Sequence, residues 1–134
     1  MITRRTVIAG SMAIAAIFGG PAFAAPRRGR LMRLLDPDND GTIDLNEAKQ
    51  AASKLFDKLD RDRDGTLDRR EIGRRMSRAE FAAADPDKDG TLSKDEYLKV
   101  VEDRFNAANR DNDGTLDEKE LSSRAGQALL RLLQ

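Results

Sequence analysis

The fold of this chain is decided by a stretch of twelve residues, Asp36-Pro37-Asp38-Asn39-Asp40-Gly41-Thr42-Ile43-Asp44-Leu45-Asn46-Glu47. Carboxylates stand at its first, third, fifth, ninth and twelfth positions, and a glycine stands at the sixth. The pattern returns three more times, starting at Asp60, Asp85 and Asn109. Four copies in the same register indicate a repeated structural unit and not a chance match.

The spacing of the oxygen atoms is typical of a loop that surrounds a hard cation. Such an ion takes about six to eight oxygens, from side chains at positions 1, 3 and 5, the backbone carbonyl at 7, a group at 9 and a bidentate glutamate at 12. Glycine at position 6 permits the sharp turn. This is the scheme of the EF-hand calcium loop, so the sequence predicts four metal sites. The expected ligands are Asp36, Asp38, Asp40, Thr42, Asp44 and Glu47 in loop 1, Asp60, Asp62, Asp64, Thr66, Asp68 and Glu71 in loop 2, Asp85, Asp87, Asp89, Thr91, Ser93 and Glu96 in loop 3, and Asn109, Asp111, Asp113, Thr115, Asp117 and Glu120 in loop 4.

The four loops differ in charge. Loops 1 and 2 have five carboxylates at ligand positions, whereas loops 3 and 4 have four, because Ser93 and Asn109 replace aspartate. Loop 1 contains no basic residue, while loop 2 contains four arginines that reduce its negative potential. Since affinity follows ligand charge and rigidity, we expect loop 1 to bind metal most tightly and loop 4 most weakly. The alternative, an acidic turn kept only for its shape, is strongest for loop 4.

Only 12 or 13 residues separate one loop from the next. Apolar residues at helical spacing run through 45–59 and 97–108, and each run predicts one amphipathic helix that joins two loops directly. A helix of about 15 residues is ~22 Å long, so the loops at its two ends lie too far apart to pair. We therefore expect loop 2 to pair with loop 3 and loop 1 with loop 4.

The remaining segments complete the expected fold. Between loops 2 and 3, Gly73 weakens a helix, and Ser77 with Glu80 forms a capping box that starts a new one. Apolar residues at loop position 8 suit a short strand pairing, and the leucines of 129–133 predict a last helix over the core. The sequence thus predicts an all-α fold, a compact bundle of four EF-hand loops with short inter-loop helices.

The composition excludes most enzyme chemistry. The 134 residues contain 24 basic and 24 acidic side chains but no cysteine and no histidine. Disulfides, thiolate or histidine metal sites, cysteine nucleophiles and histidine acid–base catalysis are therefore absent. Because the carboxylates are almost all committed to the loops, we expect the protein not to be an enzyme.

Residues 1–24 read as an export signal. Arg4 and Arg5 precede an apolar run from Val7 to Phe18, and Ala22-Phe23-Ala24 supplies a small-residue cleavage site. The run of 12 residues is shorter than the roughly 18 needed to span a membrane. The paired arginines loosely resemble a twin-arginine signal, and ordinary n-region charge explains them equally well. We expect a metal-binding domain over 25–134, located in the periplasm, whose first arginines form a solvated, mobile terminus or else contact an anionic surface.

The short loop spacing, the leader, and proline at loop position 2 (Pro37 and Pro86) resemble the lanmodulin family, periplasmic lanthanide-binding proteins of methylotrophic bacteria. The resemblance runs from about Leu34 to Leu133 and includes the Asn109 that opens loop 4. It implies a small helical protein, largely disordered without metal, that folds on binding rare-earth ions far more tightly than calcium. The chain departs from the family at Arg61 and Arg110, which replace proline, and at Ser93, which replaces aspartate.

Two functions follow as alternatives. The first is a binder or carrier of lanthanide(III) ions at up to four sites, the fourth being the weakest, with Ca²⁺ as the weaker ligand. The second is a calcium buffer or sensor. A partner-binding sensor exposes a Met-rich groove, whereas residues 25–134 contain only Met32 and Met76. The expected partners are metal ions. We expect no nucleic-acid binding and no stable membrane insertion after signal cleavage, and the protein partner stays unknown from the sequence.

Overall fold

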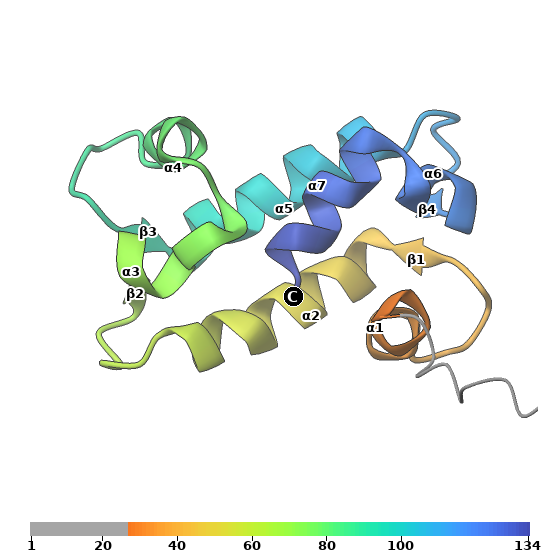
Figure 1. Ribbon diagram of the computed structural model, residues 1–134, viewed down its shortest axis with the longest axis horizontal. Helices are drawn as coiled ribbons and strands as arrows, with labels where there is room; N and C mark the ends of the chain where they lie inside the picture. The colour runs from red at the N-terminus through yellow and green to blue at the C-terminus, as the bar shows by residue number, and fades with distance from the viewer. Residues whose placement is uncertain (1–26) are drawn as a thin grey trace, which may run out of the picture.

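The computed structural model describes residues 27–134, and the predicted signal segment 1–24 lies outside them (Figure 1). The division at residue 24 therefore stays a prediction. The elements are α1 (Arg27–Leu35), β1 (Ile43–Asp44), α2 (Leu45–Leu59), β2 (Thr66–Leu67), α3 (Arg69–Ile72), the 3-10 helix η1 (Gly73–Arg75), α4 (Arg78–Ala84), β3 (Leu92–Ser93), α5 (Lys94–Ala108), β4 (Thr115–Leu116), α6 (Glu118–Ser122) and α7 (Arg124–Leu132). The predicted all-α class is confirmed, since the strands have only two residues each.

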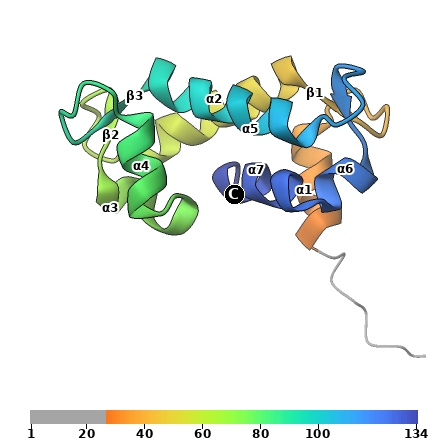
Figure 2. The same cartoon turned by 90° about the horizontal axis from the view of Figure 1, so that it is seen from above.

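Helices α2 and α5 each join two loops without interruption, as predicted. Each begins with a capping box: in α2 the carboxylate of Asp44 accepts the N–H of Glu47 at 2.7 Å, and the carboxylate of Glu47 accepts the N–H of Asp44 at 2.8 Å. The inward face of α2 buries Ala48, Ala52 and Phe56. The two helices lie side by side in both views (Figures 1 and 2).

The segment between loops 2 and 3 breaks where the sequence predicts. Gly73 has φ +60° and ends α3 after four residues, because an L side chain rarely adopts this conformation. Ser77 then caps α4, with its hydroxyl accepting the N–H of Glu80 at 3.2 Å. The chain turns back at this point, so α5 runs opposite to α2.

The loops pair across two small antiparallel ladders. In one, Ile43 faces Leu116, so loop 1 pairs with loop 4. In the other, Leu67 faces Leu92, so loop 2 pairs with loop 3. The two loop pairs lie at opposite ends of α2 and α5 (Figures 1 and 2). The predicted pairing is confirmed, and the distance between the pairs follows from the length of the connecting helices.

One core runs between the two loop pairs, and helix α7 covers it. The ring centroids of Phe56 and Tyr97 lie 5.7 Å apart. The buried Tyr97 hydroxyl donates to the carbonyl of Leu132 at 2.8 Å, which fixes the end of α7 on α5. The core consists of Leu35, Ile43, Ala48, Ala52, Phe56, Leu67, Ile72, Met76, Phe81, Leu92, Tyr97, Val101, Phe105, Ala108, Leu116, Leu121, Leu129, Leu130, Leu132 and Leu133.

Helix α1 corrects one expectation. The arginine-rich start was expected to be a solvated, mobile terminus, but 27–35 forms a helix in the structure. Leu35 is buried, and Leu31 and Met32 pack against the core. Their three- and four-residue spacing places them on one face of the helix, and their burial offsets the ordering cost of the segment. Within 27–134, no helix is long and apolar enough to cross a membrane.

Candidate metal centres

The four loops share one backbone conformation. The glycine at position 6 has φ between +81° and +86° in every loop. The residue at position 4 also has positive φ: Asn39 at +60°, Arg63 at +57°, Lys88 at +56° and Asn112 at +55°. Sequence reasoning missed position 4. Asparagine in loops 1 and 4 was the available signal, since it tolerates the left-handed region better than most residues.

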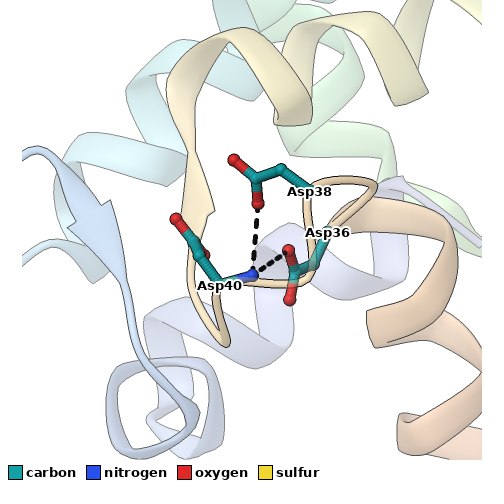
Figure 3. Close-up of side chains that lie close together, drawn as sticks. All are labelled: Asp36, Asp38 and Asp40. Carbon is teal, nitrogen blue, oxygen red and sulfur yellow. Dashed lines mark hydrogen bonds between the residues drawn. The ribbon is translucent and has the colours of Figure 1, made fainter.

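The position 1 side chain is fixed from inside the loop. The N–H of the position 6 glycine donates at 2.9 Å to the carboxylate of Asp36, Asp60 or Asp85. In loop 1 the N–H of Asp40 also donates to Asp36 at 3.1 Å and to Asp38 at 3.3 Å, which draws the three aspartates together (Figure 3). In the folded loop these bonds orient the carboxylates toward one another.

Positions 5 and 7 are also linked in every loop. The aspartate at position 5 accepts both the N–H and the hydroxyl of the position 7 threonine, at 2.8 to 3.1 Å. These bonds fix the conformation of the loop at position 7, whose backbone carbonyl is the group that the EF-hand scheme takes as a ligand.

In each loop the structure brings three carboxylates together. Their candidate ligand oxygens lie within 4.8 Å of one another. The groups are Asp36, Asp38 and Asp40 in loop 1, Asp60, Asp62 and Glu71 in loop 2, Asp85, Asp87 and Glu96 in loop 3, and Asp111, Asp113 and Glu120 in loop 4. Glu47 lies outside the group of its loop. Three carboxylate oxygens at this separation make an oxygen-rich site suited to a hard cation.

Position 9 has a structural role that the ligand scheme does not include. Asp44, Asp68, Ser93 and Asp117 are the N-caps of the helices that follow their loops, and each accepts the N–H of the position 12 glutamate at 2.7 to 3.2 Å. The capping bonds occupy one oxygen of each side chain. A position 9 group that also contacts an ion would do so with its other lone pairs or through water.

Position 2 separates the loops into two kinds. In loops 2 and 4 the N–H of Arg61 or Arg110 donates to one oxygen of the position 12 glutamate, at 3.0 and 2.9 Å. Loops 1 and 3 have proline there and so lack this donor. The position 12 glutamate therefore accepts a hydrogen bond from the position 2 backbone in loops 2 and 4 but not in loops 1 and 3.

Two buried oxygens fit a cation. Asp85 and Asn109, at position 1 of loops 3 and 4, are 5% and 8% exposed. One side-chain oxygen of each has no hydrogen-bond partner within the described part of the chain. Buried acceptors are normally satisfied, and an ion at the centre of the loop would supply the missing partner.

The position 3 aspartates share a raised pKa in all four loops. The pKa is raised at Asp38, Asp62, Asp87 and Asp111. At Asp38 and Asp87 the largest cause of the raised pKa is the neighbouring position 1 carboxyl, Asp36 or Asp85. At Asp62 the first cause is burial. Crowded carboxyls thus share protons that a metal ion must displace.

Metal affinity is expected to fall in acid, starting at a higher pH than ordinary aspartates would give. The reason is the raised position 3 pKa: affinity is full above these values and is lost as the pH drops through them. Titration calorimetry from about pH 7 to about pH 4, in buffers of different ionisation enthalpy, measures both the affinity and the protons released. Constant affinity across this range would contradict the assignment of these carboxylates as ligands.

Comparison with known proteins agrees with this geometry. The EF hand family matches residues 53–77 and 78–101. Together with the four acidic loops, this makes the chain a metal-binding protein of the EF-hand class. The chain is also 51% identical over 75 residues to lanmodulin of Methylorubrum extorquens, an alignment that covers 54% of this chain and 56% of that protein. The chain is thus similar to lanmodulin and to EF-hand proteins over these segments. It spans about half the length of this curated relative.

Proposed function

We propose that this protein is an exported, periplasmic binder of lanthanide ions, with calcium as a weaker ligand, and that it folds as it binds them. The observation that carries the proposal is the crowding of three carboxylates within 4.8 Å at each of four loops. Its role is binding and not catalysis. The ion is the cargo of the protein.

The charge of the loops supports a trivalent ion. Loop 1 places five carboxylates at ligand positions and contains no basic residue. Five negative charges are better balanced by a trivalent ion than by a divalent one. Pro37 stiffens the same loop, which lowers the cost of ordering it around an ion. The resemblance to the lanmodulin family implies the same cargo.

The distribution of acidic residues supports folding on binding. Twenty of the 24 acidic residues lie inside the four loops. Without metal, each loop must hold like charges together, and the core that opposes this repulsion includes only a few large aromatic side chains, Phe56, Phe81, Tyr97 and Phe105. Metal binding removes the repulsion and orders the loops, so the binding free energy becomes folding free energy.

The proposal of export rests on residues 1–24. Their basic start, apolar run and small-residue end fit a secretory signal. The lack of cysteine is compatible with a compartment outside the cytoplasm.

A calcium buffer or sensor is the second candidate. Ser93 and Asn109 reduce loops 3 and 4 to four ligand-position carboxylates, which brings their charge closer to that suited to a divalent ion. The match to the EF hand family also covers loops 2 and 3.

A competitive titration with lanthanum and calcium decides between the two ions. The full chain without its leader is titrated under buffered free-metal conditions, and the two dissociation constants are compared. We expect lanthanum to bind at least about a hundredfold more tightly, a difference of ~2.7 kcal/mol. Equal affinities would overturn the lanthanide proposal and favour the calcium reading.

A further inference from the structure

Three arginines converge on one hollow that none of the predicted ligands lines. Arg74 and Arg75 of η1, Arg131 of α7 and Gln134 line an open surface hollow of about 320 Å³. Acidic side chains do not contribute to its lining within the described residues. The hollow joins the turn between loops 2 and 3 to the last helix, so its two walls come from segments that are distant in the sequence.

The guanidinium of Arg75 is held in a defined position. Its Nε–H donates to the carbonyl of Gln134 at 2.6 Å, and one terminal nitrogen donates to the carbonyl of Ile72 at 3.4 Å. An arginine has five N–H donors, so three of them remain. A guanidinium positioned in this way loses less conformational entropy on binding than a mobile one.

The acidic side chain on which Arg131 acts already has other partners. The charge of Arg131 acts on Glu80. However, one oxygen of Glu80 pairs with Arg104 at 3.1 Å and the other accepts the N–H of Ser77 at 2.7 Å. The salt bridges found within 27–134 do not include Arg74, Arg75 or Arg131. Arg74 and Arg131 therefore meet Arg75 without a carboxylate side chain beside them, while Arg75 is already paired with the main-chain oxygen of Gln134, a carboxylate oxygen where the structure ends.

We propose that this hollow is an oxyanion site, and that its ligand is a tetrahedral dianion of the phosphate class. Arginine forks bind phosphate-type oxygens in pairs. A dianion balances three guanidinium groups better than a single carboxylate does. A ligand bound here bridges η1 to α7 and so holds the loop 2 and loop 3 pair against the last helix. The site shares no side chain with the metal loops and does not depend on the identity of their ion.

The test follows the arginine side-chain N–H signals by NMR in the full chain at constant metal concentration. Sodium sulfate is the probe, with sodium chloride at equal ionic strength as the reference. We expect the Arg75 Nε–H signal to shift saturably with sulfate alone. The double variant Arg74→Gln/Arg131→Gln should weaken sulfate binding at least tenfold. Arg124→Gln, which removes one positive charge from an exposed position of α7 outside the hollow, should leave it unchanged.

Some results would overturn the site. They are shifts that do not saturate, equal shifts in chloride, or equal sulfate binding in the double variant and in Arg124→Gln. Circular dichroism of the double variant verifies that it remains folded, since Arg74 and Arg131 are exposed.

A second experiment, co-sedimentation with lipid vesicles, identifies the source of the oxyanion. Co-sedimentation with vesicles that contain phosphatidic acid, whose phosphomonoester can carry two negative charges, but not with pure phosphatidylcholine, assigns a lipid headgroup if the double variant loses it. Saturable sulfate binding without co-sedimentation assigns a soluble phosphate-class ligand. The absence of both kinds of binding refutes the proposal.

Discussion

Removing bound metal from the full chain with a chelator is expected to lower its helical content, and adding metal back is expected to restore it. A site filled at about a hundred times its dissociation constant stabilises the fold by roughly 2.7 kcal/mol. Four such sites together contribute on the order of 10 kcal/mol, which is comparable to the whole stability of a typical domain. Far-UV circular dichroism and the thermal unfolding midpoint measure the change.

Sodium chloride provides the control for this first prediction. Salt screens the repulsion among the loop carboxylates but does not coordinate to them. If chloride at high concentration restores as much helix as the metal does, charge screening drives folding and coordination does not. A circular dichroism spectrum that is the same with chelator and with saturating metal would contradict coupled folding.

Replacing Gly126 by alanine is expected to destabilise the metal-bound protein by roughly 1–3 kcal/mol. An added Cβ would lie 2.6 Å from the Cα and the carbonyl oxygen of Leu121, and it would also clash with the carbonyl of Glu120. These are backbone atoms of α6, so the clash cannot be relieved by rotating a side chain. Chemical denaturation at saturating metal measures the loss.

The expected loss of stability in Gly126→Ala is opposite in sign to the usual effect of this substitution. Glycine to alanine in a helix interior ordinarily stabilises by about 0.5–1 kcal/mol. A more stable Gly126→Ala protein would therefore mean that α6 and α7 do not approach as closely as described. The exposed Arg124→Ala, on the same helix, is the matched control and should change stability little. Because Glu120 is also the position 12 residue of loop 4, Gly126→Ala should weaken that site further.

Much of the architecture could be predicted from the spacing of the loops. Twelve residues between loops 1 and 2 leave room for one helix, and that helix is α2. Its length forces the loops at its ends apart, which determines the pairing of loop 1 with loop 4. Gly73 and Ser77 locate the break between loops 2 and 3, since both act through local backbone chemistry.

Features that depend on contacts distant in sequence could not be predicted. Helix α1 forms because Leu31, Met32 and Leu35 find a core to pack against, and an arginine-rich sequence does not show that core. The close approach of Gly126 to α6 and the meeting of Arg75 with Arg131 likewise depend on where α7 packs.

The candidate ligands were predictable as a set, but their separate roles were not. The EF-hand spacing places carboxylates around each loop regardless of which oxygen contacts an ion. Asp44 caps α2, and Glu47 lies outside the group of three carboxylates in loop 1. Both features depend on side-chain conformation. In loops 2 and 4 the position 12 glutamate also accepts a hydrogen bond from the backbone N–H of Arg61 or Arg110. Proline at the same position of loops 1 and 3 has no N–H to donate.

The number of metal ions bound per chain tests the central claim most directly. The full chain without its leader is dialysed to equilibrium against free lanthanum, and bound metal is measured by elemental analysis. The four carboxylate groups predict four ions per chain at saturation, with the last ion binding most weakly. Fewer than two ions per chain would show that the loops are acidic turns and would contradict the account.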